Sequence, residues 1–222
     1  IKEKEIQYTS TEKYKKQFCE IKIPKIKWVK IAYSRQHQGR ILSGTISQDV
    51  DGKYYISLCC TEVEHKILKQ TNKNIGLDLG LKSLYTTSDG ETKENPKYYR
   101  KHEKKIIREQ RKLSRRKLNG KNRNKQRLKL NKWHKYISNC REDYNNKETT
   151  NLVKTYDIIC IEDLQVNNMI KNHKLAKSIG DVSWSDFCTK LEYKAKWNDK
   201  LVVKVDKFYL KIGGASLSPS ES

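Results

Sequence analysis

The chain has 222 residues, and 48 Lys and Arg against 26 Asp and Glu give it a formal net charge of +22. This length accommodates one sizeable domain with a smaller one beside it. The positive charge favours a polyanionic partner, most commonly nucleic acid, with an acidic membrane surface as the alternative. No apolar run reaches the roughly 18 residues of a membrane-spanning helix, and no secretory signal is visible, so a cytoplasmic location is expected.

The cysteines and histidines are scattered without the spacing that metal sites need. No CxxC pair and no HxxxH or HxH motif occurs, so these residues predict no zinc site. The chain begins at Ile1 rather than Met. Residues 210–222 are rich in Gly and Ser and are expected to form a disordered tail. Both ends are therefore expected to be those of a fragment.

Residues 1–74 are predicted to form a partial antiparallel β domain. Strand-like runs occupy residues 27–33, 41–47 and 54–60, whereas residues 1–18 are charged and weakly patterned. The Asp51-Gly52 pair between the last two runs is a strong hairpin signal.

Residues 75–209 are predicted to form a second domain. Strands are expected at 75–80 and 84–87, followed by a turn and a short third strand that Asn95-Pro96 ends. The helical composition of residues 97–155, broken near Gly120, predicts an inserted hairpin of two long helices.

The remaining residues complete a mixed sheet. Tyr156–Ile161 is a continuous apolar run, typical of a strand buried on both faces. Trp184, Phe187, Cys188, Leu191 and Ala195 recur at helical spacing, and Asp181 or Ser183 is expected to cap that helix. With a last strand at 201–205, this order predicts an α/β fold of the ribonuclease-H type.

Two carboxylates interrupt the apolar runs. Asp78 lies within Ile75–Leu81 and Glu162 follows Ile158–Ile161. A charge in a buried strand is costly unless it is paired or holds a metal, and two-metal nucleases hold Mg²⁺ between clustered carboxylates. Asp78 and Glu162 are therefore candidate catalytic and metal-binding residues. The alternative is that Asp78 pairs with a lysine and Glu162 caps the following turn; no convincing third carboxylate is apparent.

The predicted helical hairpin is strongly basic. Residues 97–135 contain 18 Lys and Arg against two acids, whereas a solvated helix face usually intersperses acids among its basic residues. Contact with phosphates is the favoured role, with a merely solvated charge run as the alternative. The candidate nucleic-acid ligands are Lys97, Arg100, Lys101, Lys104, Lys105, Arg108, Arg111, Lys112, Arg115, Arg116, Lys117, Lys121, Arg123 and Arg127, with Lys171 and Lys174 in a later polar segment.

Several motifs together resemble the TnpB (OrfB) family, which small bacterial insertion sequences encode and which is often described as a transposase. This family is itself similar to the type V CRISPR effectors. The resemblance covers about residues 20–209. The matching segments are Ile75–Ser83, Asn95–Tyr98, Leu113–Lys117, Ile161–Leu164, Lys171–Ile179 and Leu191–Ala195, with Ile23–Ile26 and Gly52–Tyr55.

The resemblance implies an RNA-guided DNA endonuclease whose RuvC-like domain cuts DNA with Mg²⁺. A guide RNA from the element's end would pair with one DNA strand, so the implied partners are DNA and guide RNA, with no membrane and no small-molecule substrate. Asp78 and Glu162 would be the first and second RuvC carboxylates. Residues before about 74 would correspond to the wedge domain that grips guide RNA, and the bacterial nucleoid is the implied location.

The chain also departs from the family pattern. The family's N-terminal strand and helical recognition region have no counterpart here. The family's zinc ribbon and the third RuvC aspartate that follows it also have no counterpart here. Asp206 does not correspond to that aspartate. A two-carboxylate site should hold a second metal poorly, so we expect nucleic-acid binding with little or no cleavage. The alternatives are a fragment of an active nuclease, a non-cleaving RNA-guided DNA-binding module and an inactive remnant.

Overall fold

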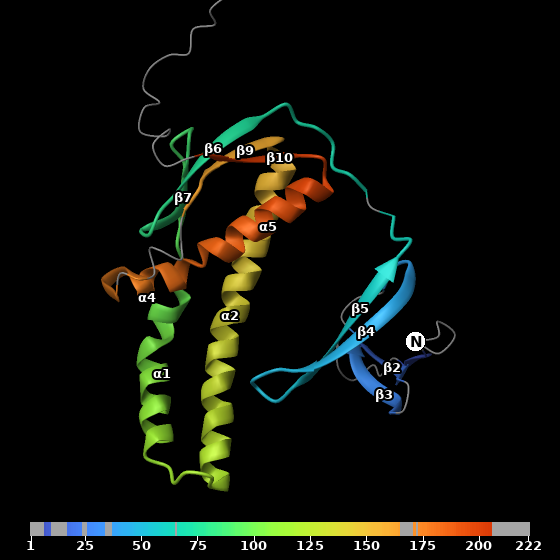
Figure 1. The fold of residues 1–222 in the computed structure, drawn as a ribbon, viewed down its shortest axis with the longest axis vertical. Coiled ribbons are helices and arrows are strands. Elements are labelled where there is room, and N and C mark those ends of the chain that lie inside the picture. Colours follow the sequence, from blue (N-terminus) through green and yellow to red (C-terminus); the bar gives the residue numbers. More distant parts are fainter. Residues whose placement is uncertain are drawn as a thin grey trace, which may run out of the picture. The chain divides into compact units, whose positions relative to one another are not determined.

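The computed structural model describes residues 7–9, 17–23, 26–33, 37–64, 66–164, 171 and 173–205. Its contacts divide the chain into two compact units, Ile1–Lys66 and Ile67–Ser222. Figure 1 traces both along the chain. The expected tail and Asp206 lie outside the described residues.

The first unit contains short antiparallel β-sheets. Its strands are β1 Gln7–Thr9, β2 Gln17–Ile23, β3 Lys27–Tyr33, β4 Arg40–Gln48 and β5 Tyr54–Thr61. The first three form one sheet in chain order, and β4 pairs with β5. The predicted turn is confirmed: the Gly52 N–H donates to the Asp49 carbonyl over 2.9 Å, and Gly52 has φ +85°, where a side chain would be strained. The sequence pattern predicted neither β1 nor β2, since the first strand-like run that it indicated begins at residue 27.

The second unit is built on a five-stranded mixed sheet. The strands are β6 Asn74–Leu79, β7 Ser83–Thr87, β8 Thr92–Glu94, β9 Ile158–Glu162 and β10 Leu201–Val205, in the order β10-β9-β6-β7-β8. Strands β10, β9 and β6 run parallel to one another. Strand β7 pairs antiparallel with β6, and β8 pairs antiparallel with β7. The mixed α/β class is confirmed.

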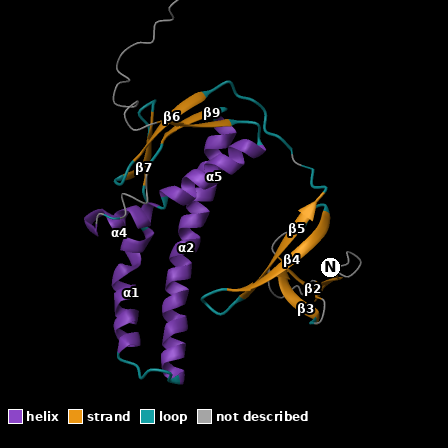
Figure 2. Cartoon of the chain, in the orientation of Figure 1, coloured by secondary structure: helices purple, strands orange, loops and turns teal. Residues whose placement is uncertain are grey.

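Helices form two of the connections between strands in the second unit, as Figure 2 shows. They are α1 Tyr98–Ser114 and α2 Lys121–Thr155 between β8 and β9, then α4 His173–Val182 and α5 Trp184–Trp197 between β9 and β10. The two-helix insertion and its break near Gly120 thus appear where the sequence placed them. No helix among the described residues is both long and apolar enough to cross a membrane.

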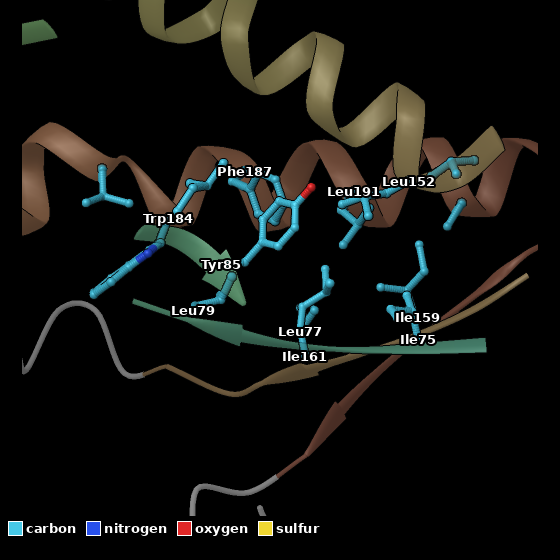
Figure 3. Close-up of a cluster of buried hydrophobic side chains, with 14 of the residues drawn as sticks. Ile75, Leu77, Leu79, Tyr85, Leu152, Ile159, Ile161, Trp184, Phe187 and Leu191 are labelled. Carbon is cyan, nitrogen blue, oxygen red and sulfur yellow. The ribbon is translucent and has the colours of Figure 1, made fainter. Parts of the chain in front are cut away.

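One face of the mixed sheet carries the apolar core. In Figure 3, α5 and the C-terminal part of α2 lie over this face, with Leu152, Phe187 and Leu191 facing the strands. The strands contribute alternate residues, Ile75, Leu77 and Leu79 from β6 and Ile159 and Ile161 from β9. Burying one such side chain contributes about 1.5–3 kcal/mol through its removal from water.

The prediction that β9 is buried on both faces is wrong. Ile159 and Ile161 are buried, whereas Ile158, Cys160 and Glu162 are only half-buried. The reason is that α2 and α5 cover one face of the sheet, and the described residues place no helix against the other. Hydrophobicity alone did not report this asymmetry, because both faces of β9 carry apolar side chains.

The predicted cap of α5 is also wrong. Ser183 precedes α5 but makes no side-chain capping bond to it. Asp181 instead accepts the Tyr99 N–H over 2.9 Å and the Arg100 N–H over 3.3 Å, at the first turn of α1. Since α1 has no capping side chain of its own, a carboxylate from α4 satisfies its free amides.

Candidate functional site

The two candidate catalytic carboxylates come from neighbouring parallel strands. The register of β6 and β9 pairs Leu77 with Ile161, so Asp78 and Glu162 are the next residues along the two strands. Neighbouring strands lie about 4.8 Å apart, which brings the two side chains within reach of one cation. Because Leu77 and Ile161 face the core, side-chain alternation directs Asp78 and Glu162 to the opposite face. Asp78 is exposed there and Glu162 half-buried.

The strands beside β6 and β9 set the surroundings of Asp78 and Glu162. Within the described residues, Asp78 makes no ion pair with a lysine, and the other part of the structural alternative, a cap by Glu162, stays untested. Its neighbour across β7 is Thr86, and Val205 of β10 lies beside Glu162. Asp163, next along the chain, is exposed, and its N–H donates to the Val205 carbonyl over 2.9 Å.

The pair suits a magnesium ion in its chemistry. Both side chains offer carboxylate oxygens, and Mg²⁺ is commonly held by one or two carboxylates together with water and substrate phosphates. The described residues contain no group of three or more His, Cys, Asp or Glu that could hold a metal. Asp78 and Glu162 therefore stay a predicted metal pair, and the described residues show no group of three ligands around them.

The basic helical hairpin has only a thin apolar core. Ile106 of α1 packs with Leu130 and Ile137 of α2. Beside them Glu109 is buried, and it accepts a hydrogen bond from the Gln126 side chain over 2.7 Å. This bond, with Lys112 nearby, lowers the pKa of Glu109 to about 2. The two helices are thus joined by a buried carboxylate as well as by apolar contact. Ile107 and Leu128 are exposed.

Some of the predicted nucleic-acid ligands are engaged within the fold. Arg108 and Lys112 pair with Glu109. The Arg123 guanidinium donates to the carbonyl of Leu113 over 2.8 Å, which satisfies the end of α1. Others have partial contacts: Arg100 donates to the Ser178 hydroxyl, and Lys101 and Lys105 lie over the rings of Tyr98 and Trp133.

Most of the remaining predicted ligands face solvent. Within the described residues, seven are exposed and make no ion pair or side-chain hydrogen bond: Lys104, Arg111, Arg115, Arg116, Lys117, Lys121 and Arg127. Lys97 is half-buried, with a left-handed φ of 48°, and Lys171 is exposed. The side chain of Lys174 lies outside the described residues. Uncompensated positive charge therefore concentrates around the turn between α1 and α2.

Sequence reasoning missed how the hairpin is attached to the sheet domain. Arg141 of α2 donates to Asp181 over 3.1 Å, so Asp181 links α4 to both hairpin helices. Lys194 of α5 donates to the Asn146 carbonyl and to the hydroxyls of Thr149 and Thr150 on α2. These contacts attach the basic helices to α4 and α5. In the sequence, the only signal for these contacts was the presence of polar residues such as Thr149 and Thr150 on α2.

The fold defines a mixed α/β protein with a carboxylate on each of two adjacent parallel strands and a strongly basic helical insertion. The family model OrfB_IS605, described as "Probable transposase", matches residues 57–173, more than half of the chain. The chain belongs to this family, and the membership predicted from its motifs is confirmed.

Curated relatives carry names that agree with this family. One from Streptomyces pristinaespiralis, named "Putative RNA-guided DNA endonuclease", is 36% identical over 165 residues, which are 74% of this chain and 41% of the relative. "Putative RNA-guided DNA endonuclease InsQ" of Escherichia coli (strain K12) is 34% identical over 202 residues, 84% of this chain and 50% of the relative. The chain therefore spans half or less of the length of these relatives.

Among solved structures, a chain of "Cryo-EM structure of the Cas12f1-sgRNA-target DNA complex" aligns with a TM-score of 0.45 and 13% identity. The alignment covers 86% of this chain and 35% of that chain. So distant a likeness carries no argument about the site.

Proposed function

We propose that this chain forms the RuvC-like part of an RNA-guided DNA endonuclease and binds nucleic acid through the exposed basic residues of α1 and α2. The curated relatives' names and the family membership support this reading. The observation that supports it is the register of β6 and β9, which pairs Leu77 with Ile161 and so makes Asp78 and Glu162 the next residues along two adjacent parallel strands. DNA and a guide RNA are the proposed partners, at the bacterial nucleoid.

In this proposal the two carboxylates act as metal ligands rather than as proton donors. Asp78 and Glu162 would hold Mg²⁺ against a phosphate of the bound strand. When bound, Mg²⁺ supplies Lewis-acid stabilisation of the charge that develops at the phosphate. The strands fix both carboxylates, so little rearrangement of the protein is needed when the ion binds. The exposed side of the sheet leaves room for a phosphate to approach Asp78.

We also propose that the chain as given binds nucleic acid more effectively than it cuts it. A two-metal mechanism places both ions between clustered carboxylates, and the described residues supply two. The second candidate is therefore a non-cleaving RNA-guided DNA-binding module. In that module the same basic hairpin would bind the nucleic acid.

A cleavage assay tests the carboxylates. The purified chain is mixed with labelled DNA, the RNA of its own element end and Mg²⁺, in parallel with Asp78→Ala, Glu162→Ala and Asp163→Ala. Asp163 is the matched control, because it is an exposed acid next to Glu162. We expect weak or no cutting by the unaltered chain. Strong cutting that both Asp78→Ala and Glu162→Ala abolish would refute the proposed cleavage deficiency and support the metal site; cutting that survives both would refute the site.

A binding assay at several salt concentrations tests the hairpin. Replacing Arg115, Arg116 and Lys117 together by Ala should flatten the dependence of affinity on salt, by about 0.7–0.9 in logarithmic slope for each phosphate that the variant no longer neutralises. Replacing the exposed Lys69, Lys73 and Lys196 removes the same charge outside the hairpin and should change the slope little. Equal slopes for the two triple variants would show that net charge, not the hairpin, drives binding.

A further inference from the structure

Three aromatic rings meet on the surface of the basic hairpin. His102 of α1 lies 5.7 Å from Trp133 and 5.4 Å from Tyr136 of α2, measured between ring centroids. Trp133 and Tyr136 meet edge to face at 6.1 Å. The His102 ring is itself held, since its Nδ1 donates to the Tyr98 carbonyl over 3.0 Å. The rings therefore brace one another from two helices.

The three rings do not all serve the hairpin core. Trp133 packs partly against the buried cluster of Ile106, Leu130 and Ile137, but Tyr136 does not belong to it. Tyr136 is 50% exposed. A tyrosine that only filled the helix interface would bury more of its ring, because burial is the main source of its contribution to stability. The exposed part of Tyr136 is thus an aromatic surface whose ring contacts His102 and Trp133.

Lysines of α1 lie against the rings of this region. The Lys105 ammonium lies 5.0 Å from the centroid of Trp133, and that of Lys101 lies 5.8 Å from Tyr98. The exposed Lys104 is on the same helix and, within the described part of the chain, makes no ion pair. Aromatic rings set among cations that can follow a backbone are the usual composition of surfaces that bind single-stranded nucleic acid.

We propose that Tyr136, in contact with His102 and Trp133, is a stacking site for an unpaired nucleobase, with Lys105, which lies over Trp133, to contact a flanking phosphate. This inference rests on the proposed binding of nucleic acid by the hairpin and adds a base-contacting residue to it. An unpaired base is required, because paired bases in a duplex are stacked on their neighbours and hide their faces.

The test compares two single-stranded oligomers of about 20 positions, longer than one site of this kind. One carries thymine at every position; the other has the same sugar–phosphate backbone with abasic sites. Affinities of the full chain are measured by fluorescence anisotropy, and the ratio of the two affinities reports contact with bases alone. The variants are Tyr136→Ala, Tyr136→Phe and, as a phosphate-contact control, Lys104→Ala, each checked by thermal unfolding.

We expect the unaltered chain to prefer the thymine oligomer, and Tyr136→Ala to reduce that preference about 5-fold or more. Tyr136→Phe should keep it, because the ring and not the hydroxyl stacks. Lys104→Ala should weaken binding of both oligomers equally. An unchanged preference in Tyr136→Ala, or an equal loss on both oligomers, overturns the stacking site while leaving backbone binding intact. Failure of the unaltered chain to bind either oligomer would instead refute the proposed function.

Discussion

Replacing Asp181 should loosen the basic hairpin from the sheet domain. The Asp181 carboxylate is buried, with a side-chain exposure of 1% against 23% for its partner Arg141. It accepts two backbone amides from the first turn of α1 as well as the bond from Arg141. Asp181→Ala therefore removes a helix cap and leaves a largely buried arginine without its partner.

The cost follows from these contacts. Loss of a capping side chain costs about 1 kcal/mol, and loss of a hydrogen bond to a charged group costs about 1.5–3 kcal/mol. Asp181→Ala should therefore lower the free energy of unfolding by about 3 kcal/mol. Ser183→Ala is the comparison variant, because Ser183 makes no capping bond to α5 and its hydroxyl makes an exposed bond to the Gly180 carbonyl over 3.3 Å. It should change stability by less than about 0.5 kcal/mol.

Urea unfolding and amide hydrogen exchange together measure the effect. Urea reports the loss of stability of the unit, and exchange reports whether the Tyr99 and Arg100 amides lose protection first. Equal losses in Asp181→Ala and Ser183→Ala would refute the reasoning, as would unchanged protection of the two amides in Asp181→Ala. Either result would mean that Asp181 does not cap α1.

Three further predictions concern the packing of the second unit. The pKa of Glu109 falls from its ordinary value of 4.5 to about 2 on folding, so its contribution is present above pH 4.5 and is lost as the pH falls towards 2; thermal unfolding at several pH values should show a smaller loss on acidification in Glu109→Gln. Lys194→Met should destabilise α5 against α2 by about 1.5–3 kcal/mol in urea unfolding, because it leaves the Thr149 and Thr150 hydroxyls without that donor; no change would show that these bonds exchange freely with water. Phe187→Ala, at a fully buried position, should cost about 3–5 kcal/mol by the same measurement, and a cost under about 1 kcal/mol would contradict the core of Figure 3.

Local signals in the sequence were enough for most of the second unit. Helical spacing predicted the buried face of α5 from Trp184, Phe187, Cys188, Leu191 and Ala195, and all of these but the partly buried Cys188 are buried. The break near Gly120 predicted two helices, because Gly and Asn disfavour a continuous helix. These features depend on residues that lie close together in the sequence, so the local pattern predicts them without knowledge of the tertiary contacts.

The sequence predicted which carboxylates belong to the candidate site but not how the strands that carry them are arranged. Charges at Asp78 and Glu162 interrupt apolar runs, which marked both as unusual. Their closeness required β6 and β9 to be adjacent and parallel, although the two carboxylates lie far apart in the sequence. The assignment of Asp181 failed for the same reason, because its true partner at Tyr99 is 82 residues away.

What the sequence by itself determined is therefore the family, the mixed α/β class, the helical insertion and the concentration of positive charge, because each follows from local pattern or from the order of motifs. Tertiary structure alone decided which basic residues remain free for a phosphate, since Arg108, Lys112 and Arg123 are taken up by partners that packing supplies. It also decided which face of the sheet stays open at Asp78. Burial and pairing depend on contacts between distant segments, and no local pattern along the chain encodes them.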